Sequence, residues 1–436
     1  METSEMNEKM TRVSAGTPVG ELMRRYWHPI VGVADFKGKW TRRVRLLGED
    51  LVLYRSRAGK LGLIAEFCPH RRASLAYGFP TEEGIRCPYH GWMYNEHGAC
   101  LDQPNEKSSS FKDKINTPAY PVEELGGLIF AYLGPLPAPL LPRYDAYVVP
   151  GAIRMIGKAI LPINWLQIME NSVDPVHTEW LHGHLFEAVK EKAAANGGLV
   201  KNPISRHHVR IAFKETEYGI TKTRLLEGQS EDCDDWQIGH PLVFPTTLVG
   251  GTSDPNTQTY KYQVRVPMDD THTLHIWYNA YVPPTGTEIP KHLLDSIPVH
   301  EVPYRNADGE PMLDCVDGQD IMAWMTQGTI ADRTKEHLGA SDAGIANFRR
   351  LLRREWEKVE KGLDPIGVIR DPTQNTLIEF PTERSKHHYS DGFASSLYRG
   401  QARHSSFAHD IVKLFERQPR DDEHLKQARH ESVPSS

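Results

Sequence analysis

The sequence has few cysteines, no long uninterrupted apolar run and no excess of basic residues. Its five cysteines do not form the disulfide framework of a secreted domain and fit a reducing compartment. The most apolar region, Leu125 to Pro142, is broken by glycines and prolines and cannot span a membrane. With a net charge of −6 and no visible signal peptide, we expect a cytoplasmic protein that binds neither membrane nor nucleic acid.

The length and the apolar content indicate a globular protein with more than one domain. The chain has 436 residues, of which 39% are hydrophobic, so it can bury a large core. Length alone favours two or three domains. Composition does not narrow the function further, and the specific information lies in two groups of metal-ligand residues.

The first group is Cys68-Pro-His70, followed sixteen residues later by Cys87-Pro-Tyr-His90. Each short loop offers one thiolate and one imidazole. This arrangement is typical of a two-iron, two-sulfur cluster in which one iron takes both thiolates and the other takes both imidazoles. A structural zinc site is the alternative, but zinc modules usually group a cysteine pair and then a histidine pair.

The residues around these loops favour the same interpretation. Pro69 and Pro88 restrict both loops, and Gly91 permits a tight backbone turn directly after His90. Such turns direct backbone N–H groups at inorganic sulfide, which raises the cluster potential. Tyr89 and Trp92 either shield the cluster or fill a small core.

The second group lies in Glu170-Asn-Ser-Val-Asp-Pro-Val-His-Thr-Glu-Trp-Leu-His182. Asp174 can cap a helix that has Pro175 at its first position. His177 and His182 are five residues apart, about 140 degrees of helical rotation, so if both bind one ion either the helix distorts here or the imidazoles converge from a wider arc. His184 is an alternative to His182. Two histidines without sulfur suit non-haem iron once a carboxylate completes the ligand set.

Taken together, these motifs resemble the large catalytic subunits of Rieske non-haem iron oxygenases, and the resemblance covers nearly the whole chain. The family pattern is Cys-x-His, about sixteen residues, Cys-x-x-His, and then Asn-x-x-Asp-x-x-His-x-x-x-x-His. This sequence matches it at Cys68, His70, Cys87, His90, Asn171, Asp174, His177 and His182.

The resemblance implies two cofactors, a Rieske 2Fe-2S cluster in the cysteine–histidine loops and a mononuclear Fe(II) at His177 and His182. It also implies a homotrimer or two stacked trimers, in which the cluster of one subunit serves the iron of the next. Asn171 and Asp174 would belong to the catalytic site, with Asp174 linking the iron ligands to a cluster histidine of the neighbouring subunit. A plain helix cap is the alternative role for Asp174.

The third iron ligand in this family is a carboxylate further along the chain, and Asp342 matches its position best. Asp342 opens a helix whose apolar face is formed by Ile345, Phe348, Leu351, Leu352 and Trp356. First-turn helix stabilisation, with Ser341 as the cap, is the other interpretation. Asp320 and Asp332 remain alternatives as the third ligand.

The expected fold class is α+β. We expect an N-terminal helical segment at 1–40, an all-β Rieske domain at 41–142, a catalytic domain at 143–416 with an antiparallel sheet flanked by helices, and a mobile charged tail at 417–436. In the catalytic domain, alternating segments at 209–213, 221–225, 259–266 and 273–282 predict the strands.

The resemblance to the phthalate-dioxygenase-like branch implies the terminal component of an aromatic oxygenase. Electrons would come from a separate ferredoxin or flavin reductase, and O2 would be the oxidant. The segment from Glu170 to His182 resembles the dehydrodivanillate O-demethylase group, which favours O-demethylation of a methoxylated aromatic acid. Ring hydroxylation of an aromatic carboxylate is the alternative, and an iron–sulfur electron carrier without oxygenase activity is a second one.

Overall fold

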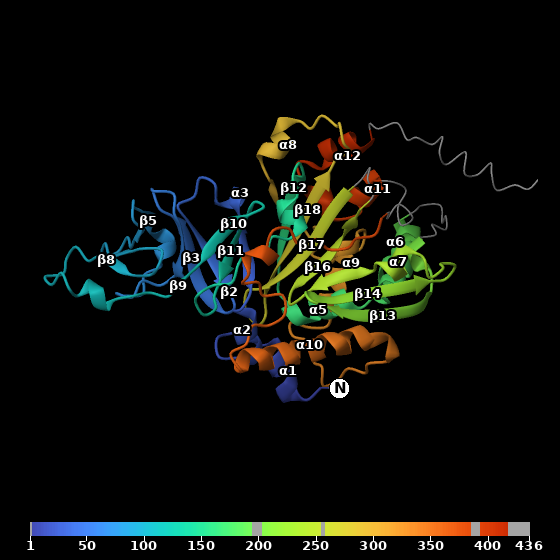
Figure 1. Cartoon of the computed structure of the whole chain (residues 1–436), viewed down its shortest axis with the longest axis horizontal. Coiled ribbons are helices and arrows are strands. Elements are labelled where there is room, and N and C mark those ends of the chain that lie inside the picture. The colour runs from blue at the N-terminus through green and yellow to red at the C-terminus, as the bar shows by residue number, and fades with distance from the viewer. Residues whose placement is uncertain (1, 194–202, 254–257, 385–392, 417–436) are drawn as a thin grey trace, which may run out of the picture.

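The computed structural model describes residues 2–193, 203–253, 258–384 and 393–416. Figure 1 shows a smaller β domain on the left and a larger sheet with helices around it on the right. The tail 417–436, for which the sequence predicts mobility, lies outside the described residues. The expected α+β class is confirmed.

The smaller domain contains three antiparallel sheets among the described residues. Two of them have four short strands each and hold the two cysteine–histidine loops near their ends. In sheet order they are β2 (Thr41–Leu46), β3 (Glu49–Arg55), β4 (Leu61–Ala65) and β9 (Ala119–Tyr120), and then β5 (Phe79–Pro80), β6 (Ile85–Arg86), β7 (Met93–Tyr94) and β8 (Cys100–Asp102). The third consists of β1 (Trp27–Gly32), β11 (Leu128–Tyr132) and β10 (Val122–Leu125).

The larger domain is built on one eight-stranded sheet. Its order is β13 (His208–Thr216), β14 (Gly219–Leu226), β15 (His240–Val243), β16 (Thr247–Thr252), β17 (Gln258–Pro267), β18 (Thr273–Val282), β12 (Ile153–Leu161) and β19 (Val299–Glu301). The pairings are antiparallel except for that of β12 with β19, which is parallel. The four segments that the sequence predicts as strands all lie inside strands of this sheet.

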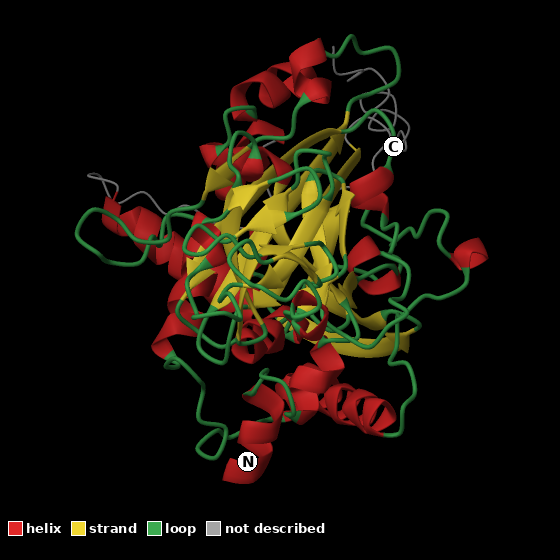
Figure 2. Ribbon diagram, turned by 90° about the vertical axis from the view of Figure 1, so that its left-hand side faces the viewer, coloured by secondary structure: helices red, strands yellow, loops and turns green. Residues whose placement is uncertain are grey.

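Helices cover the faces and ends of the large sheet, which stands in the centre of Figure 2. They are α4 (Asp145–Val148), α5 (Trp165–Val173), α6 (Leu185–Ala193), α7 (Asp234–Gln237), α8 (Lys291–Asp295), α9 (Val316–Thr326), α11 (Phe393–Tyr398) and α12 (Ala408–Glu416). The short helix α3 (Val33–Phe36) contacts β1 in the smaller domain (Figure 1). None of the helices in the described part of the chain is long and apolar enough to cross a membrane.

Three further helices gather below the sheet in Figure 1: α1 (Ser4–Thr11), α2 (Pro18–Met23) and α10 (Ala343–Glu360). Phe348, Leu351 and Leu352 are fully buried, so the apolar face predicted for α10 is the face that packs on the core. The segment 1–40, which was expected to be helical, also contributes β1, which pairs with β11 of the smaller domain. β1 is buried along nearly its whole length, so it lacks the alternation of apolar and polar residues that marks a strand in sequence.

The two domains are joined through a backbone contact between hairpins. The N–H groups of Leu47 and Gly48, in the turn between β2 and β3, donate to the carbonyls of Pro267 and Met268 at 3.0 and 2.8 Å. One apolar cluster also continues from the smaller domain into the large sheet. The cluster loops are therefore held on a frame that is continuous with the catalytic domain.

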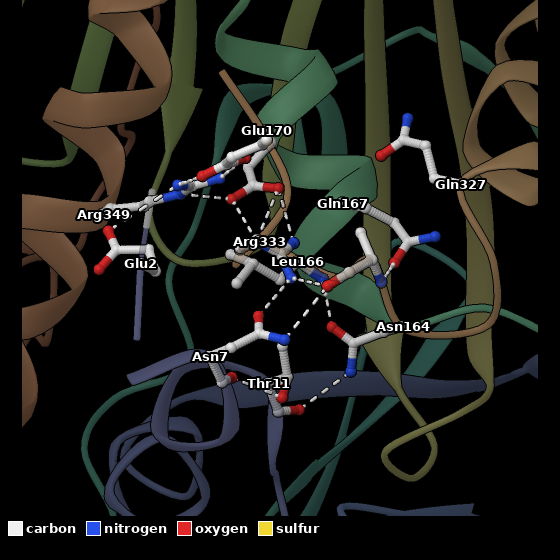
Figure 3. Close-up of polar contacts among 12 residues, drawn as sticks. Glu2, Asn7, Thr11, Asn164, Leu166, Gln167, Glu170, Gln327, Arg333 and Arg349 are labelled. Atoms are coloured by element: carbon white, nitrogen blue, oxygen red, sulfur yellow. Dashed lines mark hydrogen bonds and ion pairs between the residues drawn. The ribbon is translucent and has the colours of Figure 1, made fainter. Parts of the chain in front are cut away.

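Helix α5 lies in the centre of the larger domain and positions the segment that follows it. Its Asn164 cap accepts from the N–H of Leu166 at 3.1 Å and donates to the carbonyl of Thr11 at 2.9 Å (Figure 3). Gln167 donates to the carbonyls of Trp324 and Gly328, at 2.9 and 2.8 Å, at the end of α9. These bonds set the distance between α5 and α9, which carry the two halves of the site described below.

Candidate active site

The histidine segment begins where α5 ends. Asp174 follows the last residue of α5, and its Oδ1 accepts from the N–H of Val176 at 2.7 Å, so it caps the turn that follows. The chain then forms a π-helical segment, η3 (Thr178–His184), which continues into α6. A distorted helix is one of the two arrangements that the sequence spacing allows, and the structure shows it as a widened helical turn.

The widened turn brings His177 and His182 together. In a π-helix the hydrogen bonds span five residues, so residues five apart lie close on one side. The two imidazole rings are 5.2 Å apart, centre to centre, and nearly perpendicular. His184 points elsewhere: its Nδ1 lies 3.5 Å from Oε2 of Glu187, and 43% of its side chain is exposed. The structure therefore selects His182 over His184.

Asp320, on α9, completes the group. Its Oδ1 lies 3.2 Å from Nε2 of His182 and 3.8 Å from Nε2 of His177. These three ligand atoms lie within 4.8 Å of one another. The carboxylate thus comes from a helix that contacts α5 through Gln167, and not from α10.

The structure does not bring Asp342, which the sequence favours as the third ligand, to the two histidines. Oδ2 of Asp342 accepts from the N–H of Gly339 at 2.7 Å, which is the helix-start role weighed as its alternative. Asp332 is also remote from the histidines and bonds Thr334 and Lys335 on the surface. Spacing along the chain cannot separate three aspartates in one stretch of sequence, because tertiary packing decides which one meets the histidines.

Neighbouring side chains orient both imidazoles. Nδ1 of His182 lies 2.9 Å from Oε1 of Gln319, and Nδ1 of His177 lies 3.5 Å from Oδ2 of Asp174. With Nδ1 directed at these oxygens, each Nε2 faces Asp320. Gln319 was not anticipated from the sequence, and its position next to Asp320 on α9 is the signal that could have identified it.

The residues fit a ferrous ion. Oδ1 of Asp320 is buried and forms no hydrogen bond, as expected of an oxygen that is placed to bind a metal. Burial lowers the pKa of His177, and this outweighs the nearby carboxylates of Asp174 and Asp320, so the ring is kept neutral and able to coordinate. Burial also acts to lower the pKa of His182, but the nearby Asp320 carboxylate raises it above the ordinary value. One nitrogen from each ring and one carboxylate form the facial set that is typical of non-haem Fe(II).

The cluster loops bring like ligands together. Cys68 and Cys87 are buried, and the Cys87 thiol, followed by the Tyr94 hydroxyl at 3.3 Å, lowers the pKa of the Cys68 thiol to about 6. The rings of His70 and His90 are 4.5 Å apart, centre to centre. A thiol pair beside an imidazole pair fits a cluster with one iron held by each pair.

The backbone of both loops turns as the sequence predicts. Gly91 has a φ of 78°, and its N–H donates to the carbonyl of Cys87 at 3.0 Å. In the first loop Arg72 takes the same left-handed conformation, and its N–H donates to the carbonyl of Cys68 at 2.9 Å. Trp92 stacks on His70 with ring centres 4.4 Å apart, so it shields the cluster side of the loop.

A cavity of about 310 Å³ opens next to His177, His182 and Asp320. Strands β14 to β17 form its other wall, from which Lys222, Arg224, His240, Lys261, Gln263 and Arg265 line it. None of these six was anticipated as a pocket residue. Alternation of polar residues at every second position of β14 and β17 is the signal that could have identified them.

Asp235, His240 and Glu383 form a second carboxylate–histidine group beside this cavity. Nε2 of His240 lies 2.5 Å from Oε1 of Glu383, and Asp235 accepts from Arg224 at 3.1 Å. Asp235 ends the acidic run that starts at Glu231 and has the composition of a solvated loop, but this side chain is buried. Burial of Asp235 is possible because the guanidinium of Arg224 neutralises the negative charge of its carboxylate inside the domain.

Comparison with known proteins agrees with this geometry. A Rieske [2Fe-2S] domain model matches residues 26–121, and a model described as "LigXa C-terminal domain like" matches residues 134–290 and 312–387. The chain is 42% identical over 387 residues to the 5,5'-dehydrodivanillate O-demethylase oxygenase subunit of Sphingobium sp. (strain NBRC 103272 / SYK-6). This match covers 88% of this chain and 87% of that one.

Two further proteins extend the comparison. Identity to the phthalate 4,5-dioxygenase oxygenase subunit of Pseudomonas putida is 32% over 417 residues, covering 88% of this chain and 93% of that one. The terminal oxygenase of carbazole 1,9a-dioxygenase from Novosphingobium sp. KA1 has a similar fold, with a TM-score of 0.57 at 21% identity over 80% of this chain and 97% of that one.

The chain belongs to the Rieske non-haem iron oxygenases, as the sequence motifs predict. It is a terminal oxygenase subunit whose cofactors are a Rieske 2Fe-2S cluster and a mononuclear iron.

Proposed function

We propose that this oxygenase removes the methyl group of a methoxylated aromatic acid by O-demethylation. The observation that carries the proposal is the 42% identity, over 88% of the chain, to an O-demethylase oxygenase subunit. The cavity beside His177, His182 and Asp320 supports it, because a small aromatic substrate can reach the three proposed ligands there.

The reaction consumes one O2, two electrons and two protons for each methyl group that is removed. One oxygen atom of O2 enters a C–H bond of the methoxy group, and the other leaves as water after uptake of two electrons and two protons. In the resulting hemiacetal the bond between the ring oxygen and the methylene carbon breaks, the ring oxygen takes up the hydroxyl proton to become the phenol, and formaldehyde is released.

We propose His177, His182 and Asp320 as the ligands of the mononuclear iron. The bound iron would supply the activation of O2. Gln319 holds Nδ1 of His182 and so fixes the ring with Nε2 toward Asp320. Asn171 also lines the cavity, which supports its proposed place in the catalytic site.

The four ligands proposed for the cluster are Cys68, His70, Cys87 and His90. The buried thiol pair would hold one iron, and the two imidazole rings would hold the other. Both rings are only partly buried, so electrons can leave the cluster through this edge. A separate ferredoxin or flavin reductase is proposed as the electron donor, because the similar O-demethylase chain is itself described as one subunit.

We propose that subunits assemble as a homotrimer, or as two stacked trimers, with the cluster of one beside the iron of the next. The two sets of ligands lie in different domains of one chain, at opposite sides of Figure 1. Large aromatic side chains are exposed at both places: Tyr89 beside His90 is 55% exposed, and Trp180 on η3 is 63% exposed. Exposed aromatic residues at both ends support contact between copies.

A cytoplasmic location is proposed as well. The five cysteines form no disulfide among themselves, which is the state expected in a reducing compartment. Fractionation of the native host, followed by detection of the chain in the soluble or the membrane fraction, tests the location.

Product analysis separates O-demethylation from its alternative. The purified oxygenase is combined with a ferredoxin and a reductase and supplied with methoxylated aromatic acids under O2. Formaldehyde and a phenol in equal amounts are expected. Ring hydroxylation, for which the similarity to a phthalate dioxygenase subunit is the observation, would instead give a dihydroxylated ring and no formaldehyde. A pure electron carrier would show cluster reduction without substrate-dependent O2 uptake.

A further inference from the structure

The wall of the cavity opposite the histidines is unusually rich in positive charge. Lys222 and Arg224 come from β14, and Lys261 and Arg265 come from β17. Among the described residues that line the cavity, Asp320 is the one carboxylate, and we assign it to the iron. A bound ferrous ion would add further positive charge to the same space.

Counter-charges on the protein side compensate this wall only in part. Arg224 is paired with Asp235, but Lys222 and Arg265 donate to neutral oxygens. Lys222 donates to the backbone carbonyl of Asp174 at 3.1 Å, and Arg265 donates to the carbonyl and the side chain of Gln263 at 2.9 and 2.7 Å. Buried cations that lack a carboxylate in contact gain from an anionic ligand.

The pKa values of Lys222 and Arg265 agree with a positive charge that the protein neutralises only in part. Burial lowers the pKa of Lys222 to about 7, and the carboxylates of Asp174 and Asp320 offset this only in part. Burial also lowers the pKa of Arg265 to about 9. A carboxylate inside the cavity would stabilise the charged form of both residues.

We propose that this wall selects substrates that carry a carboxylate, and that Lys261 is the residue that determines this preference. The aromatic nature of the substrate rests on the proposed function, whereas the selection of an anion follows from the charges of the wall. The carboxylate would bind at β14 and β17, so the ring is held between this wall and the iron ligands.

The position of Lys261 distinguishes it from the other three cations. It lies on β17 between Gly250 of β16 and Asn279 of β18, and it is the one of the four that also lines a second cavity. A second cavity of about 240 Å³ adjoins the first, and the residues that line both are His182, Ile204, Lys261, Gln263 and Val316. Lys261 can therefore contact an acid group in either cavity.

Equilibrium binding without turnover tests the proposal. Isothermal titration calorimetry on the full chain, with its cluster oxidised and no electron donor present, measures the affinity of 4-hydroxy-3-methoxybenzoate and of its primary amide. The two-ring acid 5,5'-dehydrodivanillate and its diamide form a second pair. We expect each acid to bind roughly tenfold more tightly than its amide, since a hydrogen bond to a charged group typically contributes this much.

Variants assign the preference to one side chain. Lys261→Met should weaken binding of the acids roughly tenfold and leave the amides unchanged. Lys261→Arg keeps the charge and should restore most of the preference. Lys214→Met is the matched control, because Lys214 is exposed on β13 of the same sheet and does not line the cavity. An unchanged cluster absorption spectrum verifies that each variant is folded.

Three results would overturn the proposal: amides that bind as tightly as acids, no measurable binding of either acid, or an acid preference that survives in Lys261→Met. The proposed reaction can fail separately. If the acids bind in preference but release no formaldehyde on turnover, O-demethylation is wrong and anion selection stands.

Discussion

Nε2 of His182 and Oδ1 of Asp320 lie 3.2 Å apart, although the two residues belong to helical segments that are far apart in the sequence. Gln167 of α5, the helix that leads into the His182 segment, donates hydrogen bonds to carbonyls at the end of α9, the helix of Asp320. The geometry of the proposed iron site therefore depends on how two helices pack, and it can be tested one ligand at a time.

Asp320→Ala should lower the mononuclear iron content severalfold and abolish turnover, because it removes one of three protein ligands from an open site. The cluster spectrum should stay intact, since the cluster loops lie in the other domain. Metal analysis combined with visible absorption measures both. Asp342→Ala is the matched control and should keep its iron, because Asp342 bonds only the start of its own helix. Iron loss in the control, with full occupancy in Asp320→Ala, would reverse the assignment.

Cys87→Ser should prevent assembly of the Rieske cluster, because serine offers no thiolate to the pair formed with Cys68. The visible absorption bands and the EPR signal of the reduced state are expected to vanish. Cys233→Ser should keep both signals, since Cys233 lies in the larger domain next to α7. A complete Rieske spectrum in Cys87→Ser would show that the ligand assignment is incorrect.

Asp174→Asn tests whether Asp174 carries communication between the two metals or only caps a turn. Asparagine caps about as well as aspartate, so the bond to the N–H of Val176 should persist. Loss of the negative charge next to Nδ1 of His177 should nevertheless slow reoxidation of the cluster, in the presence of substrate and O2, by about 100-fold. Single-turnover stopped-flow absorption measures this rate. Near-normal reoxidation would leave only the capping role.

Glu170 should stabilise the fold through its buried arginine partners. Arg333 donates to its Oε2 at 2.6 Å and Arg349 donates to its Oε1 at 2.7 Å, as Figure 3 shows. Glu170→Gln leaves buried Arg333 facing a neutral amide, whereas Arg349 keeps its ion pair with Glu336, so we expect a loss of about 3–5 kcal/mol in the free energy of unfolding. Urea titration measures this loss. Glu217→Gln, at an exposed position, should change the free energy of unfolding by less than about 0.5 kcal/mol.

The contribution of Glu170 should also depend on pH. Burial by itself would raise the pKa of Glu170, but Arg333 and then Arg349 outweigh it and lower this pKa below the ordinary value of 4.5. A carboxylate with a depressed folded pKa stabilises the protein fully above its unfolded pKa and loses this effect as the pH falls through the folded value. The difference in stability between wild type and Glu170→Gln should therefore be constant near neutral pH and shrink below pH 4.5. A difference that grows in acid would contradict the ion pairs.

Much of the site could be derived from the chain because its ligands are close in sequence. Cys68 and His70 share one loop, Cys87 and His90 share another, and His177 and His182 share one helical segment. Local spacing then limits which metal each set can hold, whatever the rest of the fold does. The strands of the larger sheet were also accessible, because alternation along a strand is a local property.

The residues that were misjudged or missed depend on contacts between distant segments. Asp342 and Asp320 both lie near the start of a helical segment, and only packing against α5 shows which of them faces the histidines. Asp235 has the composition of a solvated loop, yet Arg224 from a neighbouring strand holds it inside the domain.

By itself the sequence determined the family, both cofactors and the local ligand sets, because these follow from residues within one or two turns of each other. The tertiary structure decided the third ligand proposed for the iron, the orientation of His182 by Gln319 and the cationic wall that includes Lys261. The physical reason is that each of these needs side chains from separate elements to converge, and only the packing of the whole core sets those distances.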